Sequence, residues 1–151
     1  KAGDGLRSMR PPQHILETAL YADDLDRAEQ FYGGILKLEK VSRVADRHVF
    51  FRCGQAMLLI FNPAETVKPS HNPDMPVPVH GAHGAGHMCF AATGAQLDDI
   101  AASLRDAGVA IEADFQWPGG ARSIYVRDPA GNSIEFAEPR LWGFDETIAN
   151  G

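Results

Sequence analysis

One stretch of the chain decides the fold: SIYVRDPAGNSIEF, residues 123–136. Two runs rich in β-branched and aromatic residues flank Asp128-Pro129-Ala130-Gly131-Asn132, whose residue types are those of a turn. The stretch therefore predicts strands over residues 123–127 and 133–137. Because side chains alternate along a strand, Glu135 faces the opposite side from Ile134 and Phe136.

A second stretch, GHMCFAA at residues 86–92, predicts a strand that begins at His87. Alternation places His87 and Cys89 on one face and Met88 and Phe90 on the other. A His and a Glu on strands of one sheet can meet over that face. Together they can hold a divalent metal ion.

Working outward, the chain repeats one pattern of elements. Residues 15–63 predict a strand (15–21), a helix that starts after Asp23-Asp24 and carries apolar residues over 25–36, and strands at 40–44, 48–53 and 56–61. Residues 87–139 predict a strand (87–92), a helix (97–107) that ends at Gly108, and strands at 109–112, 123–127 and 133–137. We therefore expect an α+β fold in which two βαβββ modules form a curved mixed sheet with a cleft.

The pattern also predicts the limits of each part. Residues 1–12 form an arm, in which Met9 is a possible native start. Residues 13–65 form the first module, 66–85 a linker, 86–139 the second module and 140–151 a C-terminal tail. We expect one structural domain overall.

The composition narrows the possible partners. The 151 residues are 44% hydrophobic and carry a formal charge of −6 with no basic block, which argues against a nucleic-acid surface. No apolar run has the roughly 20 residues of a membrane helix. The two cysteines, Cys53 and Cys89, have no metal-site spacing, which favours reduced thiols in a cytoplasmic protein.

The ordered set of motifs resembles the vicinal oxygen chelate superfamily, which includes glyoxalases, extradiol dioxygenases and bleomycin resistance proteins. The resemblance is carried by Asp24-Leu25 before Phe31-Tyr32, by Gly86-His87, and by the 128–132 turn that leads to Glu135. It implies metal ligands on the first and last strands of each module. The corresponding residues are Glu17, Leu59, His87 and Glu135. Leu59 cannot bind metal, and Glu17 stands where many members carry His.

The resemblance implies that Glu17, His87 and Glu135 hold a divalent metal ion, which could be zinc, manganese, iron or nickel. Glu135 and Glu17 are also the candidate catalytic acid–base residues. The implied function is a glyoxalase-like lyase or isomerase that acts on a small substrate with vicinal oxygens through an enediolate or oxyanion. A metal-free ligand-binding protein of the bleomycin-resistance type remains the alternative. An extradiol dioxygenase is disfavoured because a second His ligand is missing.

Four further residues are candidates for substrate binding. Trp117 and Arg122 belong to a loop before the strand at 123–127, where they offer an apolar wall and an anion contact; a plain hairpin loop is the other interpretation. Tyr125 and Cys89 could line the cleft or pack in the core. The sequence does not fix the roles of three other histidines. His80 and His83 lie in the glycine-rich linker, and His14 could replace Glu17 as a metal ligand if the strand has another register. The resemblance also implies a homodimer.

Overall fold

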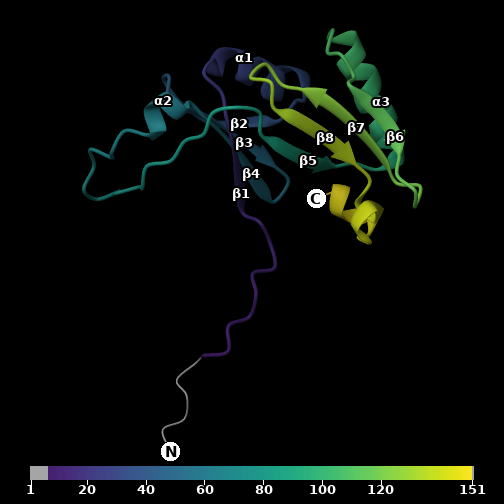
Figure 1. The fold of residues 1–151 in the computed structure, drawn as a ribbon, viewed down its shortest axis with the longest axis horizontal. Helices are drawn as coiled ribbons and strands as arrows, with labels where there is room; N and C mark the ends of the chain where they lie inside the picture. The colour runs from purple at the N-terminus through teal and green to yellow at the C-terminus, as the bar shows by residue number, and fades with distance from the viewer. Residues whose placement is uncertain (1–6, 151) are drawn as a thin grey trace, which may run out of the picture.

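The computed structural model describes residues 7–150, which fold into two mixed four-stranded sheets (Figure 1). Sheet A has the order β1-β4-β3-β2 and sheet B the order β5-β8-β7-β6. Their strands are β1 (Glu17–Tyr21), β2 (Glu39–Val44), β3 (His48–Cys53), β4 (Ala56–Phe61), β5 (His87–Ala91), β6 (Ala113–Gln116), β7 (Arg122–Arg127) and β8 (Ser133–Ala137). The repeated order confirms the two-module α+β fold, with one sheet in each module.

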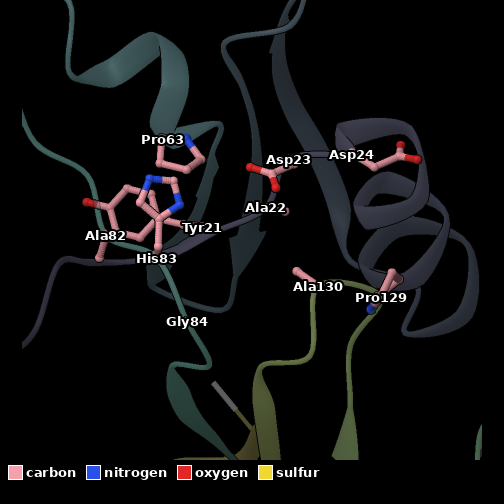
Figure 2. Close-up of a pocket in the computed structure, with 10 residues that line it drawn as sticks. All are labelled: Tyr21, Ala22, Asp23, Asp24, Pro63, Ala82, His83, Gly84, Pro129 and Ala130. Atoms are coloured by element: carbon pink, nitrogen blue, oxygen red, sulfur yellow. The ribbon is translucent and has the colours of Figure 1, made fainter.

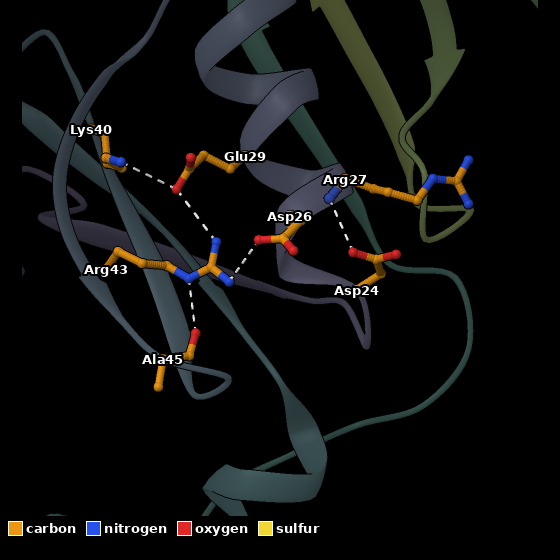
Figure 3. A network of polar contacts seen from close by, with 7 residues as sticks. All are labelled: Asp24, Asp26, Arg27, Glu29, Lys40, Arg43 and Ala45. Carbon is orange, nitrogen blue, oxygen red and sulfur yellow. Dashed lines mark hydrogen bonds and ion pairs between the residues drawn. The ribbon is translucent and has the colours of Figure 1, made fainter.

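The first helix lies over sheet A. α1 (Leu25–Glu29) begins after Asp24, whose Oδ1 accepts a hydrogen bond from the backbone N–H of Arg27 at 3.1 Å. It continues into a π-helix, η1 (Gln30–Ile35). Arg43 of β2 lies between two carboxylates of α1 (Figure 3). Its guanidinium is 3.0 Å from Asp26 and 3.4 Å from Glu29. These ion pairs tie the helix to the far edge of sheet A.

The remaining helices have local causes. α3 (Gly94–Asp106) starts with a capping box in which the Thr93 hydroxyl accepts from Gln96 N and the Gln96 side chain accepts from Thr93 N. It ends before Gly108, which has a φ of +76°. α2 (Pro63–Thr66) follows the Asn62 cap, and η2 (Pro139–Trp142) and η3 (Glu146–Asn150) form the tail. The predicted helix over 25–36 corresponds to α1 and η1 together.

Strand alternation separates a buried face from an open face in each sheet. Apolar residues of both modules share one buried core, including Leu58 and Ile60 of sheet A and Ile124, Val126 and Ile134 of sheet B. The residues between them, such as Leu59 and Glu135, lie on the opposite, open faces. The core therefore fixes which side chains of each strand are available for chemistry.

The 128–132 turn joins the two modules. Asp128 Oδ1 accepts the backbone N–H groups of Ala130 and Asn132, and its Oδ2 accepts the Tyr32 hydroxyl of η1 at 2.7 Å. The Asn132 amide donates to the Tyr21 carbonyl oxygen at 3.2 Å, and its Oδ1 accepts Gly86 N at 2.8 Å. The turn that identified the fold in the sequence thus connects the end of β1, the π-helix and the start of β5.

The helix predicted over 97–107 begins three residues earlier, at Gly94. Two predicted strands also start at least two residues from where they were expected. The strand expected at 109–112 instead forms as β6 over Ala113–Gln116, because Val109 and Ile111 pack against the core before pairing with β7 begins. The first strand begins at Glu17 rather than at residue 15, and Ile15 is 79% exposed. Of the predicted arm, residues 1–6 lie outside the described residues, and 7–12 have no regular secondary structure.

Candidate metal and substrate site

The open face of sheet B brings a His and a Glu together. β5 and β8 pair in parallel, with Cys89 opposite Glu135 and His87 opposite Ser133. The Nε2 atom of His87 lies 3.4 Å from Oε1 of Glu135. The side chain of His87 is 53% exposed and that of Glu135 only 8%, so the pair forms a buried carboxylate with an accessible imidazole above it.

A backbone contact sets the tautomer of His87. Its Nδ1 atom lies 3.0 Å from the carbonyl oxygen of Ser133, which can only accept a hydrogen bond. Nδ1 therefore carries the proton when the ring is neutral, and Nε2 keeps its lone pair on the side of Glu135. Metal-binding histidines are held by the same kind of contact. The donor set of His87 and Glu135 thus fits a divalent metal ion.

Two side chains of β7 and its loop support Glu135. Its Oε2 accepts the hydroxyl of Ser123 at 2.6 Å, and the Ser123 oxygen accepts the indole N–H of Trp117 at 2.8 Å. Sequence reasoning named Trp117 as an apolar wall and missed Ser123. The signal was present, because alternation places Ser123 on the same face as Tyr125.

An aromatic row crosses the same open face. The Tyr125 ring lies 6.2 Å from the His87 ring and 6.0 Å from the Phe115 ring, nearly parallel to both. Trp117 continues the row, 4.9 Å from Phe115. Burial and the adjacent Glu135 carboxylate raise the pKa of Tyr125 to about 12, so its hydroxyl remains a proton donor. The row provides a flat apolar wall beside the His87–Glu135 pair.

Cys89 lies directly opposite Glu135, on the face that alternation predicted. Burial of the thiol, followed by the adjacent Glu135 carboxylate, raises the pKa of Cys89 to about 12. A thiol with such a pKa is protonated at neutral pH and is a poor nucleophile. Cys89 is therefore placed to line the site. Its high pKa argues against a role as a covalent nucleophile.

Arg122 lies outside this arrangement. It is on the opposite face of β7 from Ser123, where its guanidinium binds Asp114 through two contacts of 2.8 Å and Asp98 of α3 at 2.6 Å. These carboxylates occupy its donors. The predicted anion contact therefore has no support in the structure, and Arg122 ties α3 to the hairpin instead.

Glu17 is on the other sheet. It pairs with Met57 across β1 and β4, and two residues further on Ala19 pairs with Leu59. These registers match those of β5 and β8, so Glu17 is the counterpart of His87, and Leu59 is the counterpart of Glu135. Within residues 7–150, no three His, Cys, Asp or Glu side chains form a group that could hold a metal ion. One chain thus joins His87 to Glu135 but leaves Glu17 apart from them.

Glu17 borders a cavity of about 820 Å³ on the open face of sheet A. Its apolar floor includes Leu59 and Phe61. His48, which the sequence analysis did not single out, stacks on Phe50 with a centroid distance of 3.9 Å. Burial and the adjacent Arg47 charge lower the pKa of His48 to about 4, so this imidazole is neutral at physiological pH.

The two linker histidines occupy different places. His80 lines the cavity of sheet A, and its Nδ1 lies 2.7 Å from the Tyr21 hydroxyl. His83 lines a smaller cavity of about 290 Å³ between the end of β1, the linker and the 128–132 turn, together with Asp23 and Asp24 (Figure 2). Neither cavity is lined by His87 or Glu135.

Comparison with known proteins places the chain in a family. The profile of the Glyoxalase/Bleomycin resistance protein/Dioxygenase superfamily matches residues 14–136. The chain belongs to this superfamily. A search of curated proteins gave no match.

Solved structures of the superfamily share the fold. The chain is 46% identical to a lactoylglutathione lyase from Agrobacterium tumefaciens, with 89% of this chain and 100% of that chain covered and a TM-score of 0.82. A glyoxalase/bleomycin resistance protein/dioxygenase from Nocardioides is 19% identical, with coverages of 86% and 85% and a TM-score of 0.66. A glyoxalase/dioxygenase from Nostoc punctiforme is 21% identical, with coverages of 88% and 97% and a TM-score of 0.62. The last two show the fold alone, whereas the first supports a glyoxalase-type function.

In the part of the chain that the structure describes, no helix is both long enough and apolar enough to cross a bilayer.

Proposed function

We propose that this protein is a glyoxalase-type lyase or isomerase that depends on a divalent metal ion. The observation that carries the proposal is the pair of His87 Nε2 and Glu135 Oε1, 3.4 Å apart on an open sheet face. The 46% identity to a lactoylglutathione lyase supports the reaction class. A substrate of this class is the thiol adduct of a 2-oxoaldehyde, which carries oxygens on adjacent positions.

His87 and Glu135 would hold the metal ion, with zinc, manganese, iron and nickel as the candidates for one nitrogen and carboxylate oxygens. Such an ion, when bound, supplies a Lewis acid that stabilises negative charge on substrate oxygens. The protein's own part is to orient the imidazole through the Ser133 carbonyl and the carboxylate through Ser123. Glu135, or Glu17, would also move a proton between adjacent substrate carbons.

We propose that Glu17 completes the site from a second copy of the chain. β1, which carries Glu17, and β5, which carries His87, each lie at the free end of their sheet order. Glu17 is exposed, and Ile15 and Leu16 just before it are 79% and 72% exposed. A two-fold homodimer that places sheet A of one chain against sheet B of the other would join the three ligands and cover these apolar residues.

The aromatic row gives the substrate a place to lie. Trp117, Phe115 and Tyr125 form an apolar surface that ends at His87. The Tyr125 hydroxyl, protonated well above neutral pH, can donate to a substrate oxygen. The free cysteines Cys53 and Cys89 agree with a reducing compartment, and we propose a cytoplasmic location.

A metal-free ligand-binding protein is the second candidate. It is favoured by one observation: residues 7–150 of a single chain hold no three-ligand group. In that case the cavity of sheet A, with its apolar floor and Arg47 at its border, would bind an aromatic ligand without chemistry.

Elemental analysis combined with an assay separates the two. Protein purified without chelator or metal-affinity resin is analysed for metal as wild type, as His87→Ala and as His71→Ala, whose imidazole is exposed in the linker. About one metal ion per chain in wild type and in His71→Ala, lost in His87→Ala together with isomerisation of the methylglyoxal–glutathione adduct, supports the enzyme. Wild-type protein that takes up no zinc, manganese, iron or nickel overturns it.

A further inference from the structure

A fully buried hydroxyl links Trp117 to Glu135. Ser123 has 0% of its surface exposed. Its Oγ lies 2.8 Å from the indole nitrogen of Trp117 and 2.6 Å from Oε2 of Glu135. Both distances are typical of well-formed hydrogen bonds, and the second is in the range of bonds to an ionised carboxylate.

The chemistry of the three groups fixes the direction of both bonds. An indole N–H can only donate, so the Ser123 oxygen must accept from Trp117. The single hydroxyl proton of Ser123 is then left for Glu135. An ionised carboxylate can only accept. The chain of hydrogen bonds therefore runs from Trp117 through Ser123 to Oε2 of Glu135.

The indole is held firmly enough to act in this way. Trp117 opens a tight turn in which its N–H donates to the Ala121 carbonyl and its carbonyl accepts from Gly120 N, both at 2.8 Å. Gly120 has a φ of +94°, which other residues rarely adopt. The ring also contacts Phe115. The position of the indole N–H is therefore fixed by the backbone of the hairpin as well as by packing.

The first module offers an internal comparison. The register of β3 and β4 makes Leu59 the counterpart of Glu135, Phe50 that of Tyr125, and His48 that of Ser123. Where the carboxylate is replaced by Leu59, the hydroxyl that would support it is also replaced, by the His48 ring stacked on Phe50. The carboxylate acceptor and the hydroxyl donor are thus both present in the second module and both replaced in the first.

We propose that Trp117 and Ser123 are positioning residues that commit Oε2 of Glu135 to a hydrogen bond and present Oε1, beside His87, as a single metal-binding oxygen. The metal-binding part of this proposal rests on the proposed function. The hydrogen-bond chain itself can be tested in metal-free protein.

Two tryptophans make the chain directly observable. In ¹⁵N-labelled protein each indole gives one N–H resonance, and Trp142→Phe assigns them. Trp142 is 78% exposed in the tail and serves as the control. In metal-free protein, Ser123→Ala and Glu135→Gln should both shift the Trp117 resonance and leave that of Trp142 in place. Zn²⁺ should shift the same resonance in wild type, although the indole makes no contact with the ion.

Zinc affinity, measured by titration calorimetry, tests whether the chain matters for binding. Loss of a group that orients a metal ligand typically weakens binding about 10-fold to 100-fold. We expect Ser123→Ala and Trp117→Phe each to weaken Zn²⁺ binding by about 10-fold or more, and the double variant to be no weaker than Ser123→Ala alone. Thermal unfolding of each variant separates this effect from loss of fold, and Ser123→Thr, which keeps the hydroxyl, should restore affinity.

The outcomes distinguish this inference from the proposed function. Zinc binding that is unchanged in Trp117→Phe, or that falls additively in the double variant, overturns the positioning role while the metal site stands. If wild type binds none of Zn²⁺, Mn²⁺, Fe²⁺ and Ni²⁺, the metal function falls, and the positioning of Oε1 for a metal falls with it. A Trp117 resonance that ignores both Ser123→Ala and Glu135→Gln in metal-free protein overturns the hydrogen-bond chain itself.

Discussion

His87 Nε2 lies 3.4 Å from Glu135 Oε1, while the opposite atoms of both side chains are held by Ser133 and Ser123. Each residue therefore has one atom committed to the protein and one atom facing the partner across an open face. This division of roles is what a metal site requires of its ligands before the ion arrives. It also separates residues that serve the site from residues that serve the fold.

Two buried carboxylates of the second module should respond differently to substitution. Glu135→Gln should lose Zn²⁺ affinity by at least about 10-fold and keep a near wild-type melting temperature, because within residues 7–150 no Lys or Arg pairs with this carboxylate. Glu138 accepts Arg122 N at 2.7 Å and Arg140 at 3.2 Å, so Glu138→Gln should keep zinc binding and lose stability by about 1–3 kcal/mol. Calorimetry and chemical denaturation measure both. The reverse pattern would show that Glu135 is a structural carboxylate.

The Cys89 thiol should be unreactive in the native protein. With a pKa of about 12, roughly one thiol in ten thousand is ionised at pH 8, compared with about a quarter for a free cysteine. Iodoacetamide labelling of a Cys53→Ser variant measures Cys89 alone. Because the charge of Glu135 contributes to the shift, Glu135→Gln should accelerate labelling. Labelling at the rate of an unfolded control would contradict this environment.

The hydrogen bond between Tyr32 and Asp128, which joins the two modules, should make the free energy of unfolding depend on pH in the alkaline range. Burial and the adjacent Asp128 raise the pKa of Tyr32 above its ordinary value near 10. Because the pKa of Tyr32 is higher in the folded protein than in the unfolded chain, the stabilising contribution of Tyr32 is fully present below about pH 10. It is lost as pH rises above that value. Tyr32→Phe should therefore cost about 1–3 kcal/mol at pH 7 and less at higher pH.

Chemical denaturation of Tyr32→Phe at several pH values checks this prediction. Tyr21→Phe is the control, since its hydroxyl meets only His80 of the linker. A loss of stability that is equal for the two variants, or that grows with pH, would mean that the Tyr32–Asp128 bond does not hold the modules together.

Much of the fold could be predicted because the strands alternate cleanly. Ile134 and Phe136 enter the core while Glu135 does not, and the same parity placed His87 and Cys89 on the open face. The strand at 109–112 was mistaken because its apolar residues resemble a strand but are used for packing after α3. Backbone hydrogen bonding to β7 begins only at Glu112, and regular pairing at Ala113, which depends on where β7 lies in the folded protein.

The site was only partly predictable for a similar reason. The meeting of His87 and Glu135 could be predicted because a parallel pairing of their strands follows from the module pattern. Ser123 was missed because a Ser in a strand gives no sign of a functional role until its two hydrogen-bond partners are known. The contacts of Arg122 could not be predicted because its partner Asp98 lies on α3, 24 residues away in the sequence. Whether Glu17 meets His87 within one chain or between two could not follow from spacing at all.

Subunit mixing tests the central claim, a metal site shared between two chains, most directly. Glu17→Ala and Glu135→Ala homodimers are each expected to be inactive. After the two are mixed, dissociated and reassociated, a mixed dimer contains one intact site, with Glu17 from one chain and His87 and Glu135 from the other. Random reassociation would then restore about a quarter of wild-type isomerase activity and metal content. No recovery, in a mixture that mass spectrometry shows to contain mixed dimers, would contradict the shared site.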